Sequence, residues 1–148
     1  MEELIGLYER SVGHGATLLL NVAPDNKGLF PVEEVQRVIE LGDEIKRRYA
    51  YPLAKSSGGR SVSIRLKREE DIHRMVIMEQ IEHGERVRSY VVEAEREGEW
   101  IEIARGSAIG HKKIDSLTVP IRASNIRLAI LESVGEPHIR SFSVYNGQ

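Results

Sequence analysis

The stretch GATLLLNVAPDNKG, residues 15–28, decides how the first third of this chain is interpreted. Residues 17–22 (TLLLNV) form an almost continuous apolar run that ends in a turn rich in Pro, Asp, Asn and Gly. A strand with one face in solvent alternates apolar and polar residues, whereas a run without alternation is typical of a strand buried on both faces of a parallel sheet. Such a strand needs parallel neighbours on both sides. The chain offers none, so the run predicts a strand whose sheet lies elsewhere.

Two helices are predicted on either side of this run. Leu4, Leu7 and Tyr8 recur at helical spacing, so residues 2–12 are predicted to form a helix that ends at the VGHG sequence. Pro31 opens a second helix at a position where its missing N–H costs nothing. The apolar face of that helix comprises Val32, Val35, Ile39 and Ile45. Helix–strand–helix is one and a half units of an α/β fold, which is too little to bury its own strand.

The pattern changes after residue 50. Residues 50–60 (AYPLAKSSGGR) have the composition of a linker, and from Ser61 onward apolar and polar residues alternate. Further strand candidates, separated by the turn sequences EHGE, EREGE and SVGEP, are residues 74–81, 86–94, 100–105, 126–131 and 138–145. Short strands at this spacing predict an antiparallel β-sandwich. The fold is therefore expected to be mainly β, with a domain boundary at about residue 52.

Composition and charge exclude several classes of protein. The chain has 148 residues and a formal net charge of −2, and a general nucleic-acid binder would usually be basic. It has no cysteine, so disulfides and thiolate metal sites are excluded. No apolar run approaches the roughly 20 residues of a membrane span. The N-terminal sequence MEELIGLYERS lacks the pattern of a signal peptide, which favours a cytoplasmic location. We expect neither nucleic acid nor membrane as a partner.

The order of the segments resembles one enzyme family along nearly the whole chain. SVGHGATLLLNVAPDNKGLFP followed by VIELGDEIKRRY resembles the closing end of the catalytic domain of α-L-fucosidases, glycoside hydrolase family 29. That domain is a (β/α)8-like barrel. MVIMEQIEHGERVRSYVVEA, EWIEIARGSAIGHKKI and IRASNIRLAILESVGEPHIRSFSVY resemble the C-terminal sandwich of the same family, which is similar to discoidin-like, or coagulation factor 5/8 type C, galactose-binding modules. The resemblance implies a terminal piece of the barrel over residues 1–52 and a sandwich domain over residues 53–148.

The same resemblance implies hydrolysis of terminal α-L-fucosyl residues by a retaining mechanism in the complete enzyme. Double displacement needs two carboxylates roughly 5–5.5 Å apart. In this family the Asp nucleophile and the general acid/base lie earlier in the barrel, and neither family motif occurs in this sequence. Glu33 and Glu34 are better explained as charges at a helix start. We expect no catalytic residue, no cofactor and no metal site, and no glycosidase activity from this chain alone.

Candidate binding residues fall in two regions, and each has a purely structural alternative. Asn21 and Asp25 would follow the last barrel strand, where barrel enzymes bind substrate, or they simply form a turn. In the sandwich, Trp100 is a candidate for stacking on a sugar ring or a core residue. His111 and Lys112 form either a polar patch for sugar contact or a solvated loop.

Two classes of function follow from these patterns. The first is the C-terminal portion of an α-L-fucosidase, which acts on fucosylated glycans only with a polypeptide carrying the rest of the barrel, or which associates with itself through residues 1–50. The alternative is a free-standing carbohydrate-binding or protein-interaction sandwich module. The first class accounts for the apolar run at residues 17–22, and the second does not.

Overall fold

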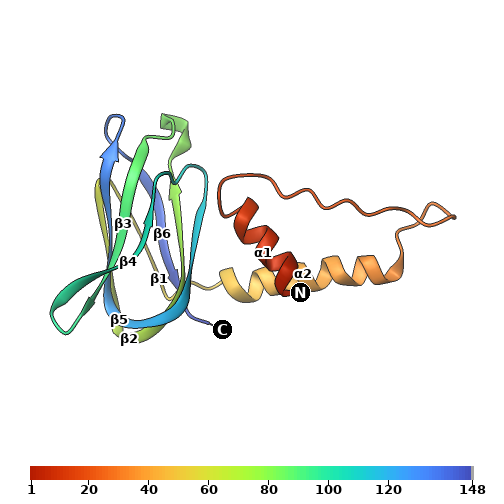
Figure 1. Cartoon of the computed structure of the whole chain (residues 1–148), viewed down its shortest axis with the longest axis horizontal. Helices are drawn as coiled ribbons and strands as arrows, with labels where there is room; N and C mark the ends of the chain where they lie inside the picture. The colour runs from red at the N-terminus through yellow and green to blue at the C-terminus, as the bar shows by residue number, and fades with distance from the viewer. Residues whose placement is uncertain (148) are drawn as a thin grey trace.

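A computed structural model describes residues 1–147 and consists of a helical arm joined to a β-sandwich (Figure 1). The arm, residues 1–52, contains α1 (Glu2–Ser11) and α2 (Val32–Tyr49). Both predicted helices are confirmed, with Pro31 as the N-cap of α2 rather than its first helical residue. Ile5 of α1 and Leu41 of α2 are buried in the arm. Neither helix is long and apolar enough to cross a membrane.

The strand predicted over residues 17–22 does not form in this chain. The segment between the helices has no regular structure and runs away from the sandwich to a turn from which α2 returns (Figure 1). Leu19, in the middle of the predicted strand, was expected to be buried but is 88% exposed to solvent. A strand exists only through hydrogen bonds to a neighbouring strand, and no described residue supplies one here. The pattern therefore identified an apolar segment correctly, but the strand predicted from it is wrong for this structure.

Six strands form the sandwich in the order β1-β6-β2-β5-β3-β4, with every neighbouring pair antiparallel. Their bounds are β1 Ala54–Gly58, β2 Ser61–Glu79, β3 Val87–Arg96, β4 Glu99–Gly106, β5 Lys113–Ser133 and β6 Ile139–Tyr145, with a 3-10 turn at Ile81–His83. The long strands β2 and β5 pair along most of their length, and their register shifts between Arg65 and Glu70 and again between Ile72 and Arg74. They bend there and pass from one layer to the other (Figure 1).

The bend creates two facing layers. One layer holds β1, β6 and the second half of β2, and the other holds β4, β3 and the second half of β5. The core between them is built from apolar side chains of both layers; its largest fully buried members are Tyr90, Phe142, Ile72, Met75, Ile77, Ile126, Leu128 and Ile139. The predicted antiparallel sandwich is thus confirmed.

Two details of the predicted strands are wrong. The alternating segment that begins at Ser61 and the strand expected at 74–81 form one continuous strand, β2, and the strand expected at 126–131 is the second half of β5. Part of the segment predicted as a linker forms β1, whose Ala54 lies opposite Val144 of β6. A Ser- and Gly-rich sequence becomes an edge strand because an open sheet edge supplies its hydrogen bonds.

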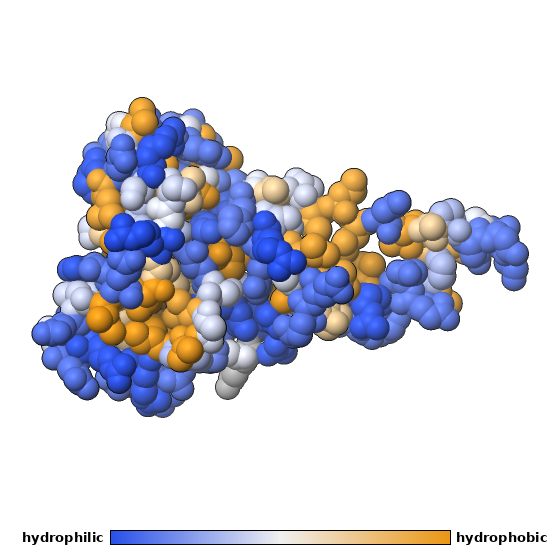
Figure 2. Space-filling view, in the orientation of Figure 1, coloured by the Kyte–Doolittle hydropathy of each residue, from blue (hydrophilic) through white to orange (hydrophobic). Residues whose placement is uncertain are grey.

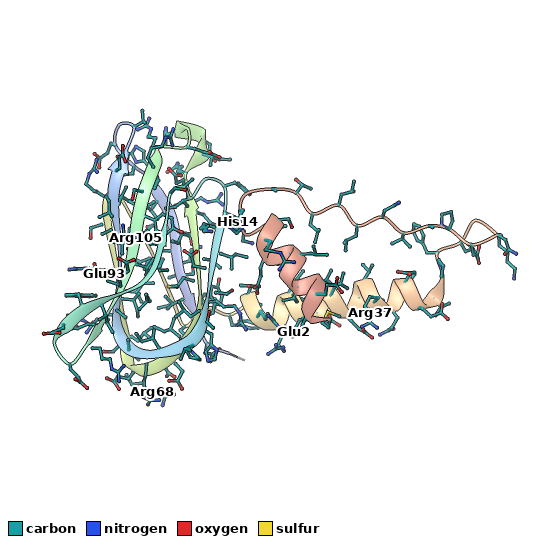
Figure 3. The ribbon with its side chains drawn as sticks, in the orientation of Figure 1. Glu2, His14, Arg37, Arg68, Glu93 and Arg105 are labelled. Carbon is teal, nitrogen blue, oxygen red and sulfur yellow. The ribbon has the colours of Figure 1, made fainter. Side chains whose placement is uncertain are left out.

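The arm and the sandwich share a packed contact. Tyr8 and Tyr49 of the arm pack on a small cluster of Val76, Ile114 and Tyr145 from the sandwich. Glu9 lies at the centre of the polar part of this contact, where it accepts hydrogen bonds from the Tyr49 hydroxyl at 2.6 Å and the Ser116 hydroxyl at 3.2 Å. The backbone N–H of Ile114 donates to the carbonyl of Gly13 at 2.8 Å. His14 lies at this junction (Figure 3), with its Nε2 2.9 Å from Nζ of Lys113.

We propose that the sandwich is an independent folding unit that begins at Leu53. A chain without residues 1–52 is expected to fold cooperatively, because the main core draws all its residues from position 53 onward and a domain carries its own core. Circular dichroism and thermal unfolding measure this: a strand spectrum and one sharp transition are expected. A chain starting at Ser61, which also lacks β1, serves as the comparison and should be less stable. A random-coil spectrum from the chain starting at Leu53 would contradict the division.

Candidate functional site

The two residues predicted at a barrel mouth lie on the segment between the helices of the arm. Oδ1 of Asp25 accepts hydrogen bonds from the backbone N–H of Lys27 at 2.8 Å and of Leu29 at 3.0 Å. Asp25 therefore closes its own turn, as side chains of this type commonly do. Asn21 is exposed and borders a small hollow whose other lining residues include Leu20, Val22 and Leu41. Nothing in this geometry brings a second reacting group to either residue.

The dominant feature of the arm is apolar and open to solvent. We call it the apolar arm surface; it comprises Leu19, Leu20, Leu29, Phe30, Val32, Val35, Val38 and Ile39. A hollow of about 320 Å³ lies between the connecting segment and α2, and Leu20, Phe30 and Val35 are among its lining residues. Figure 2 shows these hydrophobic groups exposed beyond the sandwich. A surface of this kind usually marks an interaction site, and it includes three of the four residues predicted as the apolar face of the second helix.

Charged groups hold the inner end of α2 in a defined position. Arg47 and Arg48 each donate a hydrogen bond of 2.6 Å to Oε1 of Glu44. The hydrogen bond from Arg47, followed by that from Arg48, lowers the pKa of Glu44 to about 2 against the opposing effect of desolvation. A lowered carboxyl pKa stabilises the fold above the ordinary glutamate range, and this contribution is lost as the pH falls toward 2. Arg48 also reaches Glu2 of α1 at 2.9 Å.

The contact between the arm and the sandwich also perturbs a tyrosine. Burial raises the pKa of Tyr49, and its hydrogen bond to Glu9 raises it further. The phenol therefore stays protonated and donates its proton to Glu9 throughout the physiological range. Because Arg48 and Arg74 also lie beside Glu9, the carboxylate is balanced by nearby positive charge. This cluster holds the arm against the sandwich.

Trp100 lies on the solvent side of the sandwich rather than in the core. It pairs with Glu95 across the β3–β4 hairpin and is 37% exposed. The guanidinium of Arg127 lies over the indole, 4.2 Å from the ring centroid. Nε of Arg127 in turn donates to Glu93 at 2.6 Å, and Glu93 lies on the outer face of the sandwich (Figure 3). The structural alternative for Trp100, a core residue, is therefore wrong.

His111 and Lys112 lie away from Trp100, near the arm. Nζ of Lys112 lies 3.2 Å from the hydroxyl oxygen of Tyr8 and over its ring, 5.6 Å from the centroid. Lys112 thus contributes to the contact between arm and sandwich, while His111 is exposed. The predicted polar patch of His111 and Lys112 therefore does not form one site with Trp100. Asn21 and Asp25 lie in a third region, on the segment between the helices.

Sequence reasoning missed three polar residues beside Trp100. Arg65 of β2, Asn125 of β5 and Glu95 of β3 line one cleft with the indole. They come from strands far apart in the sequence, and no motif joins them. The only feature of the sequence that points to these three residues is that each occupies an outward-facing position in an alternating strand.

The resemblance to α-L-fucosidases is confirmed by comparison with known proteins. A protein of Bacteroides thetaiotaomicron provisionally assigned as an α-L-fucosidase has a structure that matches 99% of this chain, with 40% identity and a TM-score of 0.96. A family 29 fucosidase of Ruminococcus gnavus, solved in complex with fucose, matches 99% with 27% identity and a TM-score of 0.86. Alpha-L-fucosidase 1 of Arabidopsis thaliana is 22% identical over 97% of the chain. No family model matches the chain.

The matched region is only one part of each of these relatives. The chain spans 34% of the Bacteroides protein, 37% of the Ruminococcus protein and 36% of the Arabidopsis protein. In these relatives the matched region is therefore part of a longer polypeptide.

The sandwich alone has a more distant structural neighbour. A family 32 carbohydrate-binding module from C. perfringens NanJ, solved with galactose, matches 61% of this chain and 69% of its own length. The identity is 21% and the TM-score is 0.53, which supports a shared discoidin-like fold and nothing more specific.

Proposed function

We propose that this chain is the C-terminal portion of an α-L-fucosidase, which in the complete enzyme hydrolyses terminal α-L-fucosyl residues with retention of configuration. The observation that carries the proposal is the match to the Bacteroides protein over 99% of the chain at 40% identity. The chain itself is inactive in this proposal, because a retaining glycosidase needs a nucleophile and a general acid/base roughly 5–5.5 Å apart. Two neighbouring acidic residues, Glu69 and Asp71, both lie beside Arg122, at 3.5 and 3.6 Å.

The apolar arm surface supplies the physical reason for a partner. Residues 17–22 take their place in a sheet only when neighbouring strands are present, and α2 carries exposed apolar side chains that would cover such a sheet. We propose that the occupant is the remainder of a (β/α)8-like barrel, on the same or a separate polypeptide. A second copy of this chain would cover the surface when no barrel is present. Asn21 and Asp25 would then stand at the mouth of the completed barrel, on the substrate side.

A chimera tests the proposed function. This chain would replace the matching third of the Bacteroides relative, and release of the chromophore from an aryl α-L-fucoside would be measured. We expect no hydrolysis by this chain alone or by the truncated relative alone, and hydrolysis by the chimera. A matched chimera with Leu19→Glu and Phe30→Glu should be inactive, because covering the apolar arm surface would then bury unpaired charge.

Two results would count against the proposal. Hydrolysis by the purified chain alone would show that a catalytic pair exists within it. A folded chimera that does not hydrolyse the fucoside, when the unmodified relative does under the same conditions, would show that this chain cannot take the place of the matching region.

A further inference from the structure

The outer face of the sandwich carries a shallow cleft that crosses four strands. Its volume is about 200 Å³, and its lining comprises Ser63, Ile64, Arg65, Glu95, Trp100, Asn125 and Ile126. We propose that this cleft binds a neutral sugar ring, with the indole of Trp100 under the ring and the polar side chains on its hydroxyl groups. The proposal does not require that the chain complete a barrel.

The indole is held in place before any ligand arrives. Arg127 stacks on it at 4.2 Å from the centroid, and Glu93 holds Arg127 through a hydrogen bond of 2.6 Å. The attraction between the guanidinium and the face of the indole limits rotation of the ring. Trp100 nevertheless remains 37% exposed. A large aromatic side chain that is fixed and still open to solvent is well suited to stacking, because little conformational entropy is lost on binding.

The polar side of the cleft is also organised in advance. Nε of Arg65 donates to Oδ1 of Asn125 at 3.2 Å, and Nδ2 of Asn125 donates to Oε2 of Glu95 at 2.7 Å. Within residues 1–147 these bonds leave the Nη groups of Arg65 and Oε1 of Glu95 without a protein partner. A guanidinium and a carboxylate oxygen, facing the same small space, provide donors and an acceptor for adjacent hydroxyl groups.

The balance of charge selects the class of ligand. The cleft is lined by one cation, Arg65, and one anion, Glu95, so the lining has no net charge and offers neither an anionic nor a cationic ligand a net electrostatic attraction. A pyranose is neutral, presents an apolar C–H face to an aromatic ring, and carries hydroxyl groups along its edge. Binding sites for small molecules commonly combine an aromatic surface with a few fixed polar groups in this way.

The chain carries its own reporter of this site, because Trp100 is its only tryptophan. L-Fucose, D-galactose and D-glucose would be titrated into the full chain, with indole fluorescence and the NMR signal of the indole N–H followed in parallel. We expect a saturable change for at least one sugar, with a dissociation constant of roughly millimolar order. Inorganic sulfate is the comparison ligand, and it should leave both signals unchanged.

Variants of the polar side chains test whether the sugar binds in the cleft or elsewhere on the surface. Arg65→Ala and Glu95→Gln should each weaken sugar binding by about tenfold or more, because each removes a hydrogen bond to a charged group. Arg68→Ala makes the same charge change on the same strand but outside the cleft, and should bind as the unmodified chain does. The proposal is overturned if no sugar shifts either signal, if sulfate alone does so, or if both cleft variants bind normally. None of these outcomes bears on the activity of the chimera.

Discussion

The full chain will associate in solution through the apolar arm surface, whereas a chain that starts at Leu53 will remain monomeric. Leu19 is 88% exposed and Val32 is 79% exposed, and six further apolar side chains lie on the same surface. Burying one such side chain contributes roughly 1.5–3 kcal/mol. Several together are of a size that can offset the association cost of about 4–15 kcal/mol, which arises from lost translational and rotational freedom. Light scattering over a range of protein concentrations measures the effect as a mass at least twice that of the monomer.

Charged substitutions locate the association surface. Leu19→Glu combined with Phe30→Glu should return the full chain to a monomer, because association would then bury unpaired charge. Leu131→Glu is the matched control, since Leu131 is a half-exposed leucine of β5 outside the arm; it should leave the association unchanged. A full chain that is monomeric at every concentration would show that the arm covers its apolar groups within one molecule, and would weaken the proposed docking to a barrel.

The second large effect concerns Glu79, which is 1% exposed at the end of β2. Its Oε1 accepts hydrogen bonds from the backbone N–H groups of Arg86 at 2.9 Å and Val87 at 3.1 Å, and its Oε2 accepts from Gly110 at 2.8 Å. Glu79→Leu removes the acceptor from three N–H groups. A buried donor without a partner costs about 1–3 kcal/mol, so the free energy of unfolding should fall by about 3 kcal/mol or more. Chemical denaturation measures this loss.

Two further variants test whether the carboxylate acts through these hydrogen bonds. Glu79→Gln keeps one oxygen for Arg86 and Val87 but places an NH₂ group opposite the N–H of Gly110, so a smaller loss of about 1–3 kcal/mol is expected. Glu82→Gln, at an exposed position in the neighbouring 3-10 turn, should change stability by less than about 0.5 kcal/mol. An unchanged denaturation midpoint for Glu79→Leu would contradict this prediction. It would mean that the backbone N–H groups of Arg86, Val87 and Gly110 have other hydrogen-bond acceptors.

The sequence alone determined the elements that depend on local spacing. The helices at Glu2–Ser11 and Val32–Tyr49 follow from a 3.6-residue period and a proline at the start of the second, and the sandwich follows from two-residue alternation between turns. These periods arise from backbone geometry within a few residues, so they are visible without tertiary structure. The apolar run at residues 17–22 was visible for the same reason.

The tertiary structure decided everything that depends on which strands become neighbours. Residues 17–22 remain irregular because no described strand pairs with them, and residues 54–58 become a strand because β6 has an open edge. Trp100 faces solvent because the register of β3 and β4 shifts between Val92 and Glu93 and places the indole opposite Glu95. The cleft beside it joins residues from four strands. Hydrogen bonds between strands connect residues far apart in the chain, so pairing and register are properties of the assembled sheet and not of any local pattern.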